Sequence, residues 1–136
     1  MKKIFWTGLT AGVAMMIINM ALNPIFNVIF PWLKEAYMNP VFRPWEDPIM
    51  MLFFIYPIVL GFGLSFVWDK TKKLFTKSSC QNGINFGLIY FCVSGIQTFF
   101  INYSSFNLPF VMILTWTIMM LVNGLVAGCV LAKLNK

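Results

Sequence analysis

Residues 69–77 read Asp-Lys-Thr-Lys-Lys-Leu-Phe-Thr-Lys, a short basic segment between two long apolar runs, 48–68 and 82–102. Two further apolar runs, 4–22 and 109–131, lie on either side of that pair. A helix of about 20 residues, rising 1.5 Å per residue, crosses the roughly 30 Å of hydrocarbon in a bilayer. The sequence therefore predicts one membrane-spanning helix over each of the four runs.

Positive charge is distributed unevenly about these four runs. If the four runs cross the membrane in turn, only Lys34 and Arg43 of the ten lysines and arginines lie on one side of it. Because Lys and Arg are enriched in cytoplasmic loops, we expect the N and C termini in the cytoplasm and the chain in the inner cell membrane. The other side carries Lys2, Lys3, Lys70, Lys72, Lys73, Lys77, Lys133 and Lys136.

Composition supports the same fold class. The 136 residues are 60% hydrophobic and 10% charged, whereas a soluble domain has about 25% charged residues. The net charge of +6 is concentrated at the span ends, which favours attraction to a membrane surface over nucleic-acid binding. We predict an all-α integral membrane four-helix bundle formed by a single domain, residues 1–136.

The region after the first span allows two interpretations. Pro24 removes a backbone donor, so the first helix either continues through it with a kink or stops, leaving residues 24–38 as a segment on the outer interface. Asp47 followed by Pro48 predicts an N-cap and the first helical position of the second span, and Pro57 predicts a kink inside it.

A cleavable signal peptide is the alternative interpretation of the first run. The run 4–22 is longer than a typical signal core and no small-residue cleavage site follows it, so we favour a retained span. Gly-Leu pairs at similar depths suggest two hairpins related by an axis along the membrane normal, although such pairs also recur by chance.

Glycines concentrate in the cytoplasmic halves of the predicted spans. Several pairs have the G-x-x-x-G spacing that lets helix backbones approach closely. We expect them to pack helices within the chain, with dimerisation through Gly124 and Gly128 as the alternative. The predicted packing residues are Gly8, Gly12, Gly61, Gly63, Gly83, Gly87, Gly124 and Gly128.

Polar side chains gather in the outer halves of the spans, where every helix supplies at least one at similar depth. An unpaired amide is costly in lipid, so we expect these groups to face inward. They are interpreted first as hydrogen-bonded contacts that hold the bundle together, and alternatively as a small outward-facing polar cavity. The predicted layer comprises Asn19, Asn23, Asn27, Tyr56, Gln97, Thr98 and Thr115.

Catalytic chemistry has few residues to draw on. The chain has no histidine, the commonest general base and metal ligand. Its carboxylates, Glu35, Glu46, Asp47 and Asp69, lie in loops or at span ends. We expect no catalytic, cofactor-binding or metal-binding residues and no enzyme activity, and we expect the three cysteines to be free thiols.

The order of motifs is similar to that of a known group of proteins. A basic start and a glycine-rich first span are followed by Phe62-Gly63-Leu64, by Asn-Phe-Gly-Leu-Ile at 85–89 and by Gly-Leu-Val-Ala-Gly at 124–128. This layout resembles the small four-span bacterial membrane proteins classed as domains of unknown function. The resemblance implies a four-helix membrane fold and assigns no site residues.

The sequence leaves two main functional hypotheses. The first is a non-enzymatic accessory or structural membrane protein that acts through helix contacts and its outer aromatic segment. The alternative is a transporter of small solutes or lipids that uses the polar layer. A third hypothesis, an unusual membrane enzyme that performs lipid chemistry with the outer-loop acids, is less favoured because the chain has no histidine. We expect the lipid bilayer as surroundings, a membrane-protein partner or a second copy as partner, and no cofactor and no nucleic acid.

Overall fold

The computed structural model describes residues 2–136 and contains no strand within that range. Four helical stretches, Lys2–Ile29, Pro48–Leu74, Ser79–Ser105 and Phe110–Leu134, are long and apolar enough to cross a membrane. The prediction of an all-α four-helix bundle is therefore confirmed. The elements are α1 (Lys2–Ile29), α2 (Leu33–Ala36), η1 (Pro48–Met51), α3 (Leu52–Thr71), η2 (Lys72–Leu74), α4 (Ser79–Tyr90), η3 (Phe91–Gly95), α5 (Ile96–Ser105) and α6 (Phe110–Leu134).

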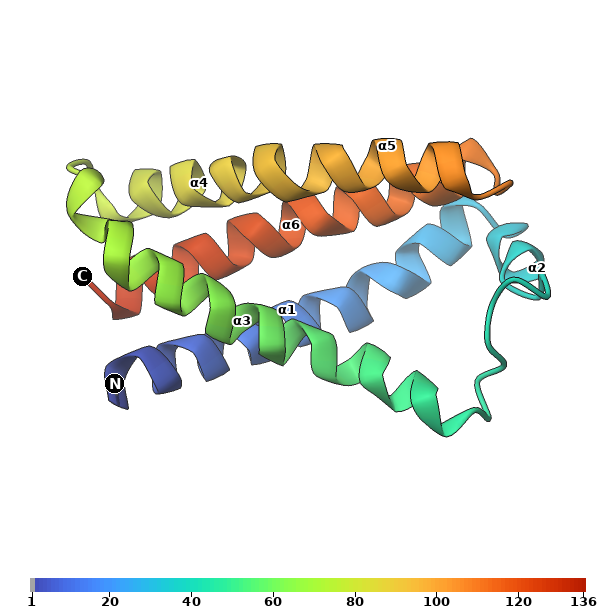
Figure 1. The fold of residues 1–136 in the computed structure, drawn as a ribbon, viewed down its shortest axis with the longest axis horizontal. Helices are drawn as coiled ribbons and strands as arrows, with labels where there is room; N and C mark the ends of the chain where they lie inside the picture. The colour runs from blue at the N-terminus through green and yellow to red at the C-terminus, as the bar shows by residue number, and fades with distance from the viewer. Residues whose placement is uncertain (1) are drawn as a thin grey trace.

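The helices form two antiparallel hairpins (Figure 1). Helix α1 packs against α3, α4 packs against α6, and contact between α1 and α6 joins the two pairs. Both ends of the chain lie at the same end of the bundle as the α3–α4 connection (Figure 1), and we call this end, which carries the eight lysines, the lysine-rich end. The opposite end, formed by residues 30–47 and 106–109, is called the loop end. An axis relating the two hairpins stays a prediction.

Helix α1 continues through Pro24 to Ile29, so the interpretation with an early stop is wrong. The hydrogen bond from Phe30 N to Phe26 O, 2.8 Å long, shows that helical bonding resumes beyond the proline. A break at this depth would leave several backbone groups unpaired in hydrocarbon, whereas a continuous helix loses one bond. The segment 24–38 is thus divided between the end of α1 and the four-residue helix α2.

The other spans begin and end near the predicted residues, except that the third span begins earlier and contains a π-helical turn. The Asp47 side chain accepts a 2.9 Å hydrogen bond from Ile49 N, and Pro48 opens η1, so the predicted N-cap is confirmed. The third span starts three residues early because Ser78 caps α4 by accepting from Gln81 N. A π-helical turn, η3, widens the middle of that span, and the sequence analysis did not anticipate it.

Glycine contacts bring the two helices of each hairpin close together in the half of the bundle nearer the lysine-rich end. A Cβ added at Gly12 would lie 2.6 Å from the Cα of Ile58, and one at Gly83 would lie 2.7 Å from the Cα of Cys129. Neither backbone has room for a methyl group. Gly8 and Gly61 meet in the first hairpin in the same way, and Gly87, Gly124 and Gly128 in the second.

Two glycine predictions require correction. A Cβ at Gly63 would meet nothing within 4 Å, because this residue lies on a face of α3 turned away from α1. Gly124 and Gly128 are buried against α4 of the same chain. Their face is already occupied, so it is not open for dimerisation.

Candidate functional site

A small polar cluster lies between α1, α3 and α6 near the middle of the bundle. The buried Asn19 donates through Nδ2 to the Tyr56 hydroxyl over 2.9 Å. The buried Asn123 side chain lies close to that hydroxyl. Two carboxamides and one phenol from three helices therefore converge at one point.

Other predicted members of the polar layer lie elsewhere. Asn23 and Gln97 are exposed on the surface of the bundle, which corrects the expectation that they face inward. Asn27 is half-buried and makes no side-chain hydrogen bond within residues 2–136. Thr98 and Thr115 donate to carbonyls of their own helices, at Ser94 and Met112. A threonine hydroxyl satisfied in this way needs no partner on a neighbouring helix, so similar depth does not imply contact.

Asn123 was missed by the sequence analysis. Depth counted from the loop end selected Thr115 as the polar residue of the fourth span, yet Thr115 bonds within α6. Asn123 is the one carboxamide between residues 110 and 134. A carboxamide has too many donors and acceptors for its own helix to satisfy, so in an apolar span it is the stronger signal of an interhelical contact.

The cluster is incompletely paired and adjoins little free space. Asn19 Oδ1 and Asn123 Oδ1 are buried and have no hydrogen-bond partner within residues 2–136. A cavity of about 40 Å³ borders Asn19 and Tyr56 between α1 and α3. That volume has room for only a few water molecules. The cluster is therefore a polar contact point and lacks the space of a solute chamber.

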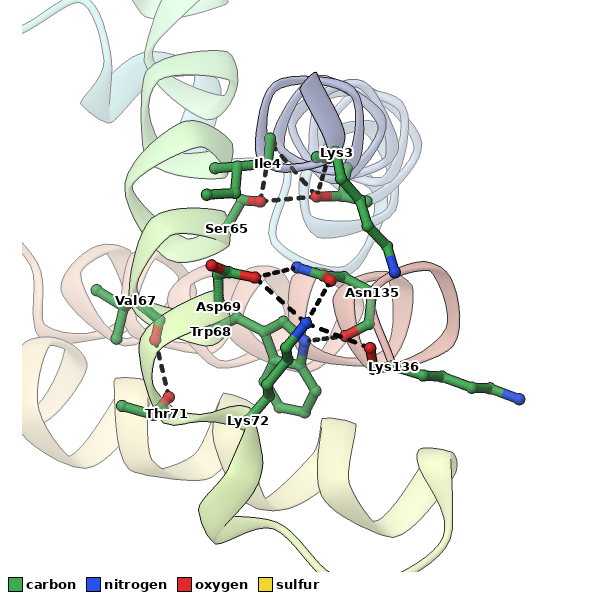
Figure 2. A network of polar contacts seen from close by, with 11 residues as sticks. Lys3, Ile4, Ser65, Val67, Trp68, Asp69, Thr71, Lys72, Asn135 and Lys136 are labelled. Atoms are coloured by element: carbon green, nitrogen blue, oxygen red, sulfur yellow. Dashed lines mark hydrogen bonds and ion pairs between the residues drawn. The ribbon is translucent and has the colours of Figure 1, made fainter. Parts of the chain in front are cut away.

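A second polar network ties α3 to the end of α6 (Figure 2). Trp68 Nε1 donates to Asn135 O over 2.8 Å, and Lys72 Nζ donates to Asn135 Oδ1 over 2.8 Å. Asp69 Oδ1 accepts from Asn135 Nδ2 at 3.2 Å and lies 3.3 Å from Lys72 Nζ. The network fixes the lysine-rich end. The sequence pattern placed Asp69 and Lys72 in a cytoplasmic loop and did not predict their contact with Asn135.

This network borders a larger cavity, of about 460 Å³, at the lysine-rich end. Its lining combines ammonium groups with aromatic and small side chains and lies between the α3–α4 connection and α6. The cavity is far larger than the space beside Asn19. The lysines that line it are Lys72, Lys73, Lys77 and Lys136.

The loop end has an aromatic contact that ties the outer segment to the bundle. Trp116 Nε1 donates to the Tyr37 hydroxyl over 2.7 Å, and Phe42 packs edge-on against Trp116 at 6.1 Å between centroids. Burial raises the pKa of Tyr37. Nearby, the backbone N–H of Ile49 and the Arg43 guanidinium hold the pKa of Asp47 below its usual value. The contacts of Tyr37 and Phe42 with Trp116 therefore anchor the segment between α1 and α3 to α6.

Residues 2–136 contain no group of three His, Cys, Asp or Glu side chains close enough to hold a metal ion. Cys80, Cys92 and Cys129 are free thiols. Comparison with protein-family models, with curated proteins and with solved structures found no match. Functional inference therefore rests on the geometry of this chain.

Proposed function

We propose that this chain is a small multi-pass membrane protein that acts without catalysis, as an accessory or structural component working through helix and interfacial contacts. It sits in the inner cell membrane with its lysine-rich end and both termini in the cytoplasm, because eight of its ten Lys and Arg side chains lie at that end. The resemblance to small four-span bacterial membrane proteins belongs to the same proposal and rests on the quoted motifs.

One observation carries the choice of an accessory role. Where polar side chains meet between the helices, Asn19 bonds directly to Tyr56, and the space beside them is about 40 Å³. A pathway for a solute needs continuous polar volume, whereas a protein that works by contact needs exposed surface. In no span is more than 33% of the apolar window buried within the chain, so most of each helix is left for lipid or a partner.

The outer aromatic segment, the loop at residues 39–48, is the surface that we assign to the partner. Trp45 is 63% exposed and belongs to a loop stiffened by Pro44 and Pro48. Exposed tryptophans are among the residues that contribute most to protein interfaces. Stiffness reduces the entropy lost when such a loop binds.

The test is mild-detergent purification of the tagged protein from native membranes, with the masses of everything that accompanies it. A stoichiometric protein partner is expected, and its recovery should fall in Trp45→Ala but not in Trp6→Ala, a matched change at a tryptophan that is also 63% exposed. Recovery of the chain as a homo-oligomer carrying solute would contradict the accessory role.

A transporter is the second candidate, and the two unpaired amide oxygens of Asn19 and Asn123 favour it. Buried acceptors without partners are rare, and a bound water, ion or ligand is one way in which they are satisfied. In this case Asn19→Leu and Asn123→Leu should each abolish flux of the solute while the protein stays folded. An accessory protein carrying the same substitutions should still recover its partner.

A further inference from the structure

The cavity at the lysine-rich end has the size and the charge of a binding site for an anion. Its volume of about 460 Å³ falls within the roughly 300–1,000 Å³ typical of ligand pockets. Four lysines line it: Lys72, Lys73, Lys77 and Lys136. An acidic ligand would therefore meet basic residues from both the α3–α4 connection and the end of the chain after α6.

Little negative charge opposes these lysines. Asp69 is the one carboxylate side chain close to the cavity within residues 2–136, and it is engaged by Lys72 and Asn135. Lys73 and Lys77 form no ion pair with any described residue. The cavity consequently keeps an excess of positive charge.

The lysines are carried by backbone that is held in place. Asn82 Nδ2 donates to the carbonyls of Phe75 and Lys77 at 3.1 and 2.9 Å, while Asn82 Oδ1 accepts from Lys77 N at 3.0 Å. On the other side Lys72 Nζ donates to Asn135 Oδ1, as Figure 2 shows. These contacts fix the loop before any ligand arrives, and preorganisation of this kind favours binding.

Part of the remaining wall is apolar. Trp68 is 2% exposed and stacks on Phe75 with 5.2 Å between ring centroids, and both rings line the cavity. The cavity also lies where the apolar spans end, at the level of lipid headgroups. A ligand that suits this site carries a phosphate next to an apolar body.

We propose that this cavity binds the phosphate-bearing headgroup of an anionic phospholipid. Basic pockets between membrane helices are suited to such headgroups. The phosphate is held by Lys73 and Lys77, because the three N–H donors of Lys72 are engaged by Asn135, Lys136 and Asp69. The glycerol and the first carbons of the acyl chains lie along Phe75. A soluble phosphate compound shares the charge but not the apolar body.

The test uses the full-length protein in a neutral detergent, with native mass spectrometry and thermal stability as readouts. Phosphatidylglycerol and phosphatidylcholine of identical acyl chains are compared, together with inorganic phosphate and glycerol 3-phosphate. Phosphatidylglycerol should bind and stabilise the protein, and the other three compounds should bind at least about tenfold more weakly. In Lys73→Gln/Lys77→Gln its binding should weaken about tenfold or more.

The matched control is Lys70→Gln/Lys133→Gln, which removes the same charge from the same end but outside the cavity. Its affinity for phosphatidylglycerol should stay within about twofold of the parent. Equal losses in the two double variants would overturn the proposal, since general surface charge would then explain the binding. Tight binding of glycerol 3-phosphate or inorganic phosphate would also overturn it and identify a soluble anion as the occupant. If the cavity double variant fails to fold, the two single variants give the same comparison.

Discussion

The lysine-rich half and the loop half of the bundle are built from the same four apolar helices but pack differently. Near the lysine-rich end, glycines such as Gly12 and Gly83 bring backbones into contact, and Trp68 is enclosed by two aromatic rings. Toward the loop end α1 and α3 diverge (Figure 1), and large side chains such as Phe53 and Phe54 are exposed. Backbone contact fixes one geometry, whereas bulky side chains leave surface for lipid or a partner.

The largest loss of stability is expected when a large side chain is removed from the centre of the lysine-rich half. Trp68→Ala should destabilise the protein by about 3–5 kcal/mol, because it leaves a cavity beside Phe75 and Phe86 and frees the Asn135 carbonyl. Titration of the detergent-solubilised protein with a denaturing detergent measures the loss. Trp45→Ala at the loop end should change stability by less than about 0.5 kcal/mol. Similar losses of stability in the two variants would contradict the tighter packing of the lysine-rich half.

A methyl group at a glycine contact should have the next largest effect. Gly12→Ala places a Cβ 2.6 Å from the Ile58 backbone, so the helices must separate, at about 1–3 kcal/mol. Gly63→Ala meets open space and should be neutral or stabilising by up to about 1 kcal/mol, since alanine favours helix. The same unfolding titration compares the two, and a destabilised Gly63→Ala would show that the interface has been misassigned.

The polar cluster should contribute less. Asn19→Leu removes the bond to Tyr56 and should cost about 0.6 kcal/mol, the average for hydrogen bonds between membrane helices. Gln97→Leu changes an exposed side chain and should cost nothing. A larger loss from Gln97→Leu than from Asn19→Leu would place the interior contact on the third span.

The smallest effect is expected at Asp47 and should depend on pH. Its pKa is lowered in the folded protein by the Ile49 N–H and then by Arg43. The stabilisation is therefore present above the ordinary pKa of an aspartate and is lost as the pH falls through the lower, folded value. Asp47→Asn keeps the cap but loses the charge. Its melting temperature should lie slightly below that of the parent at pH 7, and the gap should close as the pH falls through the lowered, folded pKa of Asp47. A gap that widens on acidification would contradict this sign.

The sequence predicted the glycine contacts of the lysine-rich half better than it predicted the polar contacts, for a physical reason. Glycines such as Gly12 at G-x-x-x-G spacing act through backbone geometry, which local sequence specifies. Whether an amide side chain faces inward depends on how the helices cross, which the sequence does not show. A prediction based on depth along each span therefore placed Gln97 together with Asn19 and did not include Asn123. The lysine cavity combines a loop fixed by Asn82 with the distant end of α6, a contact that no local pattern encodes.

The proposed orientation places the lysine-rich end in the cytoplasm and the loop end outside, and single-cysteine labelling tests it directly. One variant keeps only Cys80, which is exposed at the lysine-rich end. The other lacks all three native cysteines and carries Trp45→Cys at the loop end. In intact cells a membrane-impermeant thiol reagent should label the Trp45→Cys protein and reach Cys80 only after the membrane is opened. Labelling of Cys80 in intact cells, with Trp45→Cys protected, would contradict the account.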